Sequence, residues 1–316
     1  MARPIIGVWL SAHFDLEGLY GPALRMAASD VVVLHPSAVK DPEEVRFALC
    51  WEPGPEAFSG FANLALAMSL GAGVDGLVDH PGLNDRTQVA RIRDPLQADQ
   101  MAGFTAHEIL HREREFDTLT QAAAVRRWHP LAPRAPRSVQ VAALGHGTMG
   151  RAVVRALSIL GFGVRVACRT LPEAPMPGIT YHTGPAAISD AAQGADYLVN
   201  VLPLTHETRD VLNAAVFARL KPGAWLVQIG RGEHLVEADL ITALEAGHLA
   251  GASLDVFRQE PLPPDHVFWG NPKLRITPHV ASISQTGVVA EQVVETMRAL
   301  RDGGPMRYCI DRARGY

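Results

Sequence analysis

Cysteines are few and long hydrophobic runs are lacking in this 316-residue chain, and each absence excludes a class of protein. The three cysteines, Cys50, Cys168 and Cys309, form no CxxC pair and no metal-binding spacing, so we expect small hydrophobic residues in a reducing compartment. No apolar run is long enough to cross a bilayer. The amino terminus lacks the apolar stretch and small-residue cleavage site of a signal peptide. The sequence therefore predicts a cytoplasmic protein without a membrane partner.

An excess of positive charge is lacking as well. The chain has 29 Lys and Arg against 33 Asp and Glu, a net charge of -4, so no broad positive field exists to attract nucleic-acid phosphates. The one dense charge cluster, residues 112–115, alternates in sign and predicts a solvated helix face. No internal repeat or low-complexity tract is found. We expect a globular protein without a nucleic-acid partner.

Short apolar runs alternate with helix-like segments from end to end, which is typical of an α/β fold with a mostly parallel sheet. Strands are expected at 5–10, 31–35, 45–51, 64–70 and 88–92, and in a second series at 139–144, 164–168, 196–202, 225–229, 252–255 and 274–276. Helices are expected near 100–127, at 151–160, closed by Gly161 and Gly163, and near 288–300. The last helix should return to pack on the first third of the chain. A linker is expected at 94–98, because Pro95 lacks a backbone donor and favours extended neighbours.

A glycine-rich motif follows the expected strand 139–144. Gly145-His146-Gly147-Thr148-Met149-Gly150 fits G-x-G-x-x-G between a strand and a helix, the context that a dinucleotide-binding loop requires. The glycines at 145, 147 and 150 would permit the tight turn, the approach of a pyrophosphate and close helix packing, respectively. The helix amino terminus would offer N–H groups to the phosphates. The alternative is a plain turn between strand and helix.

The next strand ends in Cys168-Arg169-Thr170, where an NAD site would carry an acid for the ribose hydroxyls. A guanidinium suits a 2′-phosphate instead, so Arg169 and Thr170 favour NADP(H). Leu171-Pro172-Glu173 follow without further basic residues, so NAD(H) remains possible. The alternative is an arginine that merely faces solvent.

Three charged or titratable residues follow expected strands: Arg231 after 225–229, Glu260 after 252–255 and His279 after 274–276. Ligands of open parallel sheets lie beyond these carboxyl ends. A keto-acid reductase needs a cation for the substrate carboxylate, a proton donor, and a carboxylate that keeps the donor charged. Singly, the three could be a surface ion pair, a loop acid and a helix-entry residue. Their joint placement favours a catalytic set.

With these motifs the chain resembles the D-2-hydroxyacid dehydrogenase family, and it looks most like the glyoxylate/hydroxypyruvate reductases of the A type. The resemblance spans nearly the whole chain and is carried by residues 70–75, 145–150, 168–170, 202–205, 230–232, 254–264, 277–281 and 311–316. It implies two doubly wound parallel-sheet α/β domains around a cleft. The flavodoxin-like substrate domain would be 1–98 plus 287–316, and the Rossmann dinucleotide-binding domain 99–286. It also implies a homodimer with the long helix at the interface.

The same resemblance implies roles for individual residues. Arg231, Glu260 and His279 would be catalytic, and backbone amides of Ala72, Gly73 and Val74 would hold the substrate carboxylate, since such a turn can form an anion-binding nest. Trp51 either lines the substrate pocket or packs in the core. Besides the glycine loop with Thr148 and Met149, the residues assigned to the cofactor are Arg169, Thr170, Leu202, Pro203, Thr208, Ile229 and Asp255, the last orienting the nicotinamide amide.

The implied reaction is NADPH-dependent hydride transfer to a small 2-oxo acid, glyoxylate to glycolate or hydroxypyruvate to D-glycerate. A dehydrogenase for a larger 2-oxo acid and a catalytically silent NAD(P)-sensing interaction module are the alternatives, because a fold does not fix function. No metal is expected. His107-Glu108-Ile109-Leu110-His111 fits H-E-x-x-H, but residues 112–115 do not continue the pattern towards a third histidine. Other third ligands stay open on spacing alone.

Overall fold

The structure, a computed structural model, describes residues 3–312 and divides into two compact units. Unit 1 runs to Leu96 and resumes at Ile283, and unit 2 is Gln97–Ser282. The sequence placed these boundaries at 98/99 and 286/287. The last residues of the predicted tail motif, 313–316, lie outside the described residues.

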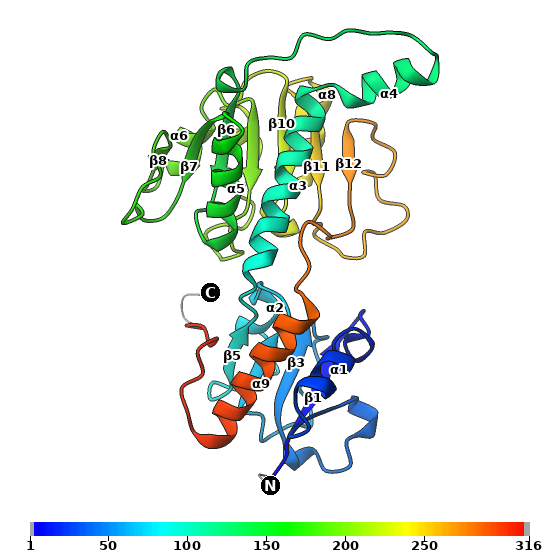
Figure 1. The fold of residues 1–316 in the computed structure, drawn as a ribbon, viewed down its shortest axis with the longest axis vertical. Helices are drawn as coiled ribbons and strands as arrows, with labels where there is room; N and C mark the ends of the chain where they lie inside the picture. Colours follow the sequence, from blue (N-terminus) through cyan, green and yellow to red (C-terminus); the bar gives the residue numbers. More distant parts are fainter. Residues whose placement is uncertain (1–2, 313–316) are drawn as a thin grey trace. The chain divides into compact units, whose positions relative to one another are not determined.

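Unit 1 is built on a parallel sheet with the strand order β2-β1-β3-β4-β5. Its strands are β1 (Ile5–Ser11), β2 (Val31–Leu34), β3 (Val45–Trp51), β4 (Leu66–Ser69) and β5 (Gln88–Arg91). Its helices are α1 (Leu16–Ala27), α2 (Asp75–Val78) and α9 (Thr286–Asp302). This strand order is the flavodoxin-like one, as predicted. Helices α1 and α9 lie side by side in Figure 1, and apolar residues of both helices pack with β1 in one core cluster, which confirms the expected return of the last helix.

Unit 2 is built on a seven-stranded parallel sheet with the order β12-β11-β10-β9-β6-β7-β8. Its strands are β6 (Gln140–Leu144), β7 (Gly163–Ala167), β8 (Thr180–His182), β9 (Tyr197–Asn200), β10 (Ala224–Gln228), β11 (Leu249–Leu254) and β12 (Leu274–Ile276). Its helices are α3 (Pro95–Glu113, which begins at the unit boundary), α4 (Phe116–Ala124), α5 (Thr148–Ile159), α6 (Ala187–Ala192), α7 (Ala214–Phe217) and α8 (Glu237–Glu245). The order reverses between β6 and β9, as in a Rossmann fold, which confirms the second predicted architecture.

Both sheets are buried on two faces, which explains why their strands read as continuous apolar runs. In β6, Val141 and Ala143 pack with α3 and α5, whereas Ala142 and Leu144 pack with α6, α7 and α8 on the opposite face. In β3, Phe47 faces the α1 and α9 side and Ala48 faces the other. Successive side chains of a strand point to opposite faces, so every position of such a run is buried.

The predicted linker at 94–98 contains the boundary between the two units, but its expected extended conformation is wrong, because α3 begins at Pro95. Proline is tolerated in the first turn of a helix, where its missing N–H would have no helical partner. The Asp94 carboxylate accepts a hydrogen bond from the Leu96 N–H at 2.8 Å and caps the helix.

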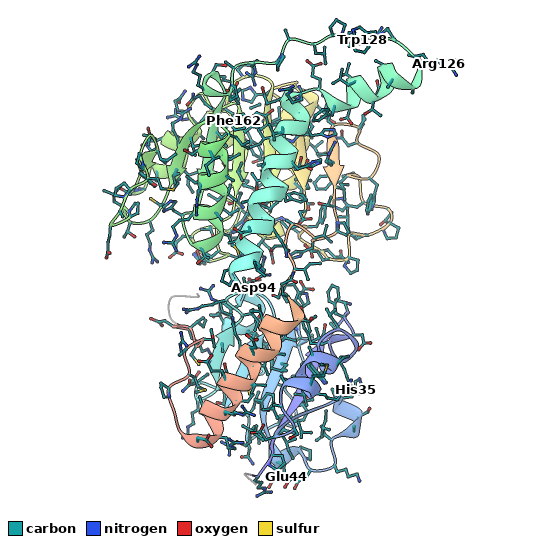
Figure 2. All side chains as sticks on the ribbon, viewed as in Figure 1. His35, Glu44, Asp94, Arg126, Trp128 and Phe162 are labelled. Carbon is teal, nitrogen blue, oxygen red and sulfur yellow. The ribbon has the colours of Figure 1, made fainter. Side chains whose placement is uncertain are left out.

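The single long helix predicted near 100–127 is wrong as well. The chain breaks between α3 and α4 at Glu115, whose φ of 50° is left-handed. The predicted solvated face at 112–115 is wrong for Glu113, whose side chain is 10% exposed and accepts hydrogen bonds from Arg134 and from Tyr197 at 2.6 Å. Helix α4 and the segment after it extend beyond the edge of the sheet, and Figure 2 labels Arg126 and Trp128 at its far end.

Smaller differences concern one short strand and the ends of two elements. Strand β8 was not predicted, α5 begins at Thr148 rather than at residue 151, and Gly163 opens β7 rather than closing α5. Within residues 3–312, no helix combines the length and the apolar character needed to cross a bilayer.

Candidate active site

Three neighbouring strands of unit 2 carry the predicted catalytic residues at one edge of the sheet. Strands β10, β11 and β12 are parallel neighbours. Arg231 follows β10, Glu260 follows β11 and His279 follows β12. The carboxyl ends of parallel strands share an edge, so the residues predicted from strand ends lie on the side where such sheets bind ligands.

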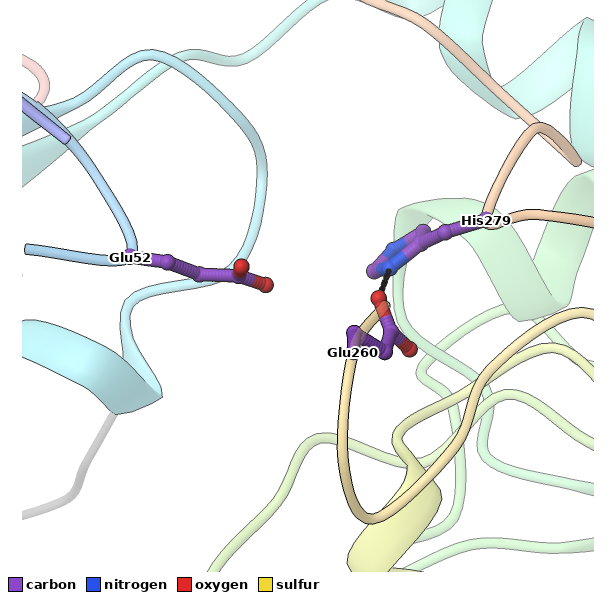
Figure 3. Close-up of side chains that lie close together, drawn as sticks. All are labelled: Glu52, Glu260 and His279. Carbon is purple, nitrogen blue, oxygen red and sulfur yellow. Dashed lines mark hydrogen bonds and ion pairs between the residues drawn. The ribbon is translucent and has the colours of Figure 1, made fainter. Parts of the chain in front are cut away.

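The Glu260 and His279 side chains form a pair at this edge. His279 Nδ1 lies 2.7 Å from Glu260 Oε2, the interaction drawn as a dashed line in Figure 3. The second carboxylate oxygen, Oε1, accepts a hydrogen bond from the Phe257 N–H at 2.8 Å, so the carboxylate is held from two sides. The His279 side chain is 23% exposed and the Glu260 side chain is 21% exposed. With Nδ1 on the carboxylate, Nε2 is the ring nitrogen that can exchange a proton with a substrate.

The backbone at His279 is strained, with a φ of 54°, and Asp255 holds it. The buried Asp255 carboxylate accepts hydrogen bonds from Thr277 Oγ1 at 2.6 Å and from the N–H groups of Val280 and Ala281, both at 2.9 Å. Burial raises the pKa of Asp255, although these hydrogen bonds oppose the shift. The loop that presents His279 is therefore fixed at its base by one carboxylate.

The Arg231 loop is shaped by its two flanking glycines. A Cβ on Gly232 would lie 1.9 Å from the carbonyl carbon of Phe257, and a Cβ on Gly230 would lie 2.8 Å from Asn200 Nδ2. Neither position tolerates a side chain without a shift of its neighbours. Arg231 Nη1 donates a hydrogen bond to the Gly230 carbonyl at 2.8 Å. Glycine is thus required on both sides of the arginine by close packing.

The glycine loop between β6 and α5 has room for a dinucleotide. Gly145 has a φ of 102°, and a Cβ on Gly150 would lie 2.2 Å from the Gly145 carbonyl oxygen. A Cβ on Gly147 would meet nothing within 4 Å. Thr148 opens α5 and is exposed, whereas Met149 packs partly against the core. Two glycines are needed for the path of the loop, and the third leaves open space at the amino terminus of α5, so these residues fit a pyrophosphate.

The remaining residues predicted to bind the cofactor follow strands β7, β9 and β10 of the same sheet. Arg169 and Thr170 are exposed just beyond β7, the neighbour of β6. After β9, the other neighbour of β6, Thr208 Oγ1 donates a hydrogen bond to the Pro203 carbonyl at 2.8 Å. Leu202 packs partly against the core on the α6, α7 and α8 side of the sheet. Ile229, the residue after β10, is buried in the core on the α3 and α5 side.

In unit 1 the predicted carboxylate-binding turn follows β4. Ser69 Oγ donates a hydrogen bond to the Gly73 carbonyl at 2.6 Å, and Arg91 Nη1 donates one to the Ala72 carbonyl at 3.2 Å. The Val74 side chain is buried in the core, so its predicted contact with the carboxylate falls to its backbone N–H. Trp51 packs partly against the core, and a Cβ on Gly71 would lie 2.0 Å from its ring. The indole is therefore a wall of the turn that begins at Gly71.

Comparison with known proteins assigns the family. Residues 106–281 match the family described as D-isomer specific 2-hydroxyacid dehydrogenase, NAD binding domain. The chain belongs to this dehydrogenase family. The prediction made from the sequence is confirmed, and the protein is an oxidoreductase that uses a nicotinamide dinucleotide.

Relatives of this dehydrogenase extend the likeness over the whole chain. A glyoxylate/hydroxypyruvate reductase A of Yersinia enterocolitica is 34% identical over 87% of this chain and 89% of its own length. The same enzyme of Serratia proteamaculans is 34% identical over 95% of this chain and 96% of its own length.

Solved structures agree with the sequence relatives. A D-isomer specific 2-hydroxyacid dehydrogenase from Xanthobacter autotrophicus, in complex with NADPH and MES, is 38% identical, with a TM-score of 0.88 and coverage of 100% of both chains. An NADPH-dependent glyoxylate/hydroxypyruvate reductase from Sinorhizobium meliloti, in complex with NADP and sulfate, is 30% identical, with the same TM-score and coverage.

The H-E-x-x-H segment of this dehydrogenase lies on α3. Glu108 is 4% exposed and accepts a hydrogen bond from Ser253 Oγ at 2.5 Å, and its other oxygen lies 3.5 Å from Arg275 Nη1. His111 Nε2 lies 3.0 Å from an Asp117 carboxylate oxygen. The glutamate therefore joins α3 to the sheet rather than facing a water molecule between the two histidines.

Sequence reasoning missed three fully buried polar residues of the dehydrogenase. Asn200 ends β9, Gln228 ends β10, and His234 lies three residues after Arg231. The first two interrupt otherwise apolar strands at their carboxyl ends. That interruption is the signal that would have found them, because a polar side chain at such a place needs a buried partner.

Proposed function

We propose that this dehydrogenase reduces a small 2-oxo acid with NADPH, converting glyoxylate to glycolate and hydroxypyruvate to D-glycerate. The observation that carries the proposal is the Glu260–His279 pair, which lies at the carboxyl ends of β11 and β12. The Arg231 loop follows the neighbouring strand β10 on the same side of the sheet. The full-length likeness to glyoxylate/hydroxypyruvate reductases supports the substrate class. The complexes of relatives with NADP or NADPH support the cofactor.

In the proposed reaction Arg231 binds the substrate. Its planar guanidinium can contact both the carboxylate and the neighbouring carbonyl oxygen of a 2-oxo acid. Negative charge grows on that oxygen during reduction, so this interaction strengthens in the transition state. In unit 1, we assign carboxylate binding to the backbone amides of Ala72, Gly73 and Val74, with Trp51 as a neighbouring wall.

His279 is the proposed proton donor. The nicotinamide, when bound, supplies the hydride to the keto carbon. His279 Nε2 gives a proton to the carbonyl oxygen, and the product is the 2-hydroxy acid. Glu260 keeps the ring oriented through Nδ1, and the ring regains its proton from solvent.

The glycine loop of Gly145, Gly147 and Gly150, with Thr148 and Met149, would hold the pyrophosphate. Arg169 and Thr170 would bind the 2′-phosphate that distinguishes NADPH, because a guanidinium pairs bidentately with phosphate oxygens. The residues that would line the rest of the cofactor are Leu202, Pro203, Thr208, Ile229 and Asp255.

We also infer that the protein is a cytoplasmic homodimer. Its three cysteines are unpaired, which suits a reducing compartment. Large apolar side chains are exposed on and after α4, including Val125 at 73% and Trp128 at 94%. A second copy of the chain would remove these side chains from water.

A panel of 2-oxo acids assayed with both cofactors tests the function. NADPH oxidation should be fastest with glyoxylate or hydroxypyruvate, and NADH should serve less well. Faster turnover of a larger 2-oxo acid would move the assignment to that substrate. NADPH binding without turnover of any member would indicate a cofactor-sensing protein and contradict the proposal.

A further inference from the structure

A closed network of hydrogen bonds joins the ends of β9 and β10 to the Arg231 loop. Its central residues, Asn200, Gln228 and His234, are each 0% exposed. Asn200 Nδ2 donates to Gln228 Oε1 at 2.8 Å and lies 2.9 Å from His234 Nδ1. Gln228 Nε2 donates to the Arg231 carbonyl at 2.8 Å. The loop that carries the proposed substrate-binding arginine is thus bonded directly to buried side chains.

The network fixes which nitrogen of His234 carries the proton. The Arg231 N–H donates to His234 Nδ1 at 3.1 Å. Asn200 also presents its amide nitrogen to Nδ1, because its oxygen accepts from the Leu202 N–H at 3.3 Å. A nitrogen that faces two donors is an acceptor, so the proton is on Nε2. Nε2 lies 3.2 Å from the Pro203 carbonyl and donates to it.

The imidazole therefore bridges two loops, with one ring nitrogen as acceptor and the other as donor. On one side it accepts from the backbone of Arg231, and on the other it donates to Pro203, whose carbonyl also accepts from Thr208 Oγ1 at 2.8 Å. The ring lies against the Arg231 loop so closely that a Cβ on Gly230 would be 2.9 Å from Nδ1. An apolar residue of similar size would fill the space but would leave the Arg231 N–H and the Pro203 carbonyl without these partners.

We propose that His234 is a positioning residue that fixes the position of the Arg231 loop relative to the Leu202–Pro203 loop. The inference rests on the proposed function, in which Arg231 binds the 2-oxo acid and Pro203 lines the cofactor. His234 is assigned no contact with either ligand. It couples the two binding loops, and its two ring nitrogens serve them separately.

Two conservative variants of His234 separate the acceptor role of Nδ1 from the donor role of Nε2. His234→Asn places a carbonyl oxygen near the position of Nδ1, so it keeps the acceptor for the Arg231 N–H and loses the donor to Pro203. His234→Gln reaches the position of Nε2 with its amide, so it keeps the donor and loses the acceptor. A matched control is His248→Gln, since His248 Nε2 lies 2.8 Å from the Phe217 carbonyl in the same unit.

The expected result is a crossed pattern. His234→Asn should raise the Kd of NADPH, measured by fluorescence titration, by about fivefold, the effect of one neutral hydrogen bond, with little change in the KM of glyoxylate. His234→Gln should lower kcat/KM for glyoxylate by about fivefold with little change in the Kd of NADPH. His248→Gln should change only the Tm.

Equal effects of both His234 variants on both quantities, or a loss of Tm alone, would overturn the inference. The NADPH titration requires no turnover, so it tests the bridge even if the wild-type protein fails to reduce 2-oxo acids. Arg231→Lys is assayed in parallel. If it retains full activity on glyoxylate, the proposed function fails, whereas an effect of Arg231→Lys without the crossed pattern contradicts only the role of His234.

Discussion

His279 owes its proposed role to two neighbours, Glu260 at Nδ1 and Asp255 at the base of its loop. Replacement by alanine removes the proton donor but leaves the glycine loop untouched. His279→Ala should lower kcat by about 10²–10⁴-fold, the usual contribution of general acid catalysis. The Kd of NADPH should stay near the wild-type value. Steady-state kinetics and a binding titration check this, with His248→Ala as the control, and near-normal kcat in a folded variant would contradict the assignment.

Arg169 follows β7 and is exposed, as a residue that meets a 2′-phosphate must be. Arg169→Asp removes a charged partner of that phosphate and adds repulsion, so both changes disfavour NADPH. The ratio of kcat/KM for NADPH to that for NADH should fall by about tenfold or more. Arg155→Asp, on the exposed side of α5, controls for the change in net charge. An unchanged ratio in Arg169→Asp would remove Arg169 from the site.

For individual residues, the sequence correctly placed Arg231, Glu260 and His279 after strands, because each of these strands is recognisable as an apolar run. It did not find Asn200, Gln228 and His234, whose partners are distant in sequence. Asn200 and His234 are 34 positions apart in the sequence, yet Asn200 Nδ2 lies 2.9 Å from His234 Nδ1. Only the order of β9 and β10 in the sheet brings these residues together, and spacing along one strand carries no information about it.

In the loop between β6 and α5, glycine has two different roles: Gly147 leaves room for the cofactor, and Gly150 allows close packing. Gly147→Ala adds a methyl group in open space, so the protein should fold normally but bind NADPH about tenfold more weakly, as a charged hydrogen bond is lost. Gly150→Ala places a methyl group against the Gly145 carbonyl. Overpacking of this kind costs about 1–3 kcal/mol, so the Tm without cofactor should fall.

Thermal unfolding without NADPH and a binding titration separate the two glycine variants. Each serves as the control of the other. A lower Tm for Gly147→Ala together with unchanged NADPH binding would show that Gly147 supports the fold and not the cofactor.

Element ends were harder to predict than elements. The start of α3 was missed because a proline was read as a break, although Asp94 caps the helix that Pro95 opens. The end of α3 was missed because Glu115 adopts a left-handed conformation that usually calls for glycine. Strand β8 is a three-residue edge strand of mixed polarity, too short to show a period of two.

At the scale of the whole molecule, the fold class followed from the alternation of apolar runs and helical segments, because only a sheet covered on both faces buries such runs completely. The flavodoxin-like and Rossmann architectures followed from the family resemblance, and the strand orders of the two sheets confirm them. The return of α9 to the first third of the chain was expected, because a short amphipathic helix needs a partner for its apolar face.

The apolar side chains after α4 bear on assembly. Trp128 is 94% exposed, and tryptophans in interfaces often contribute most of the binding energy. Trp128→Glu should raise the dimer dissociation constant by at least about tenfold, measured by sedimentation equilibrium. Met26→Glu, at a side chain 90% exposed in unit 1, is the control and should leave the mass unchanged. A wild-type protein that sediments as a monomer would contradict the proposed homodimer.

Arg231 is the residue proposed to recognise the 2-oxo acid rather than the cofactor. Lysine keeps the charge but loses the planar fork, and charge-assisted hydrogen bonds contribute about 1.5–3 kcal/mol each. The decisive measurement is therefore kcat/KM for glyoxylate, with the Kd of NADPH, in Arg231→Lys. We predict a loss of at least about tenfold in kcat/KM, with kcat itself reduced, and an NADPH Kd near the wild-type value. Full activity on glyoxylate, or a loss confined to NADPH binding, would contradict the role of Arg231 in substrate recognition.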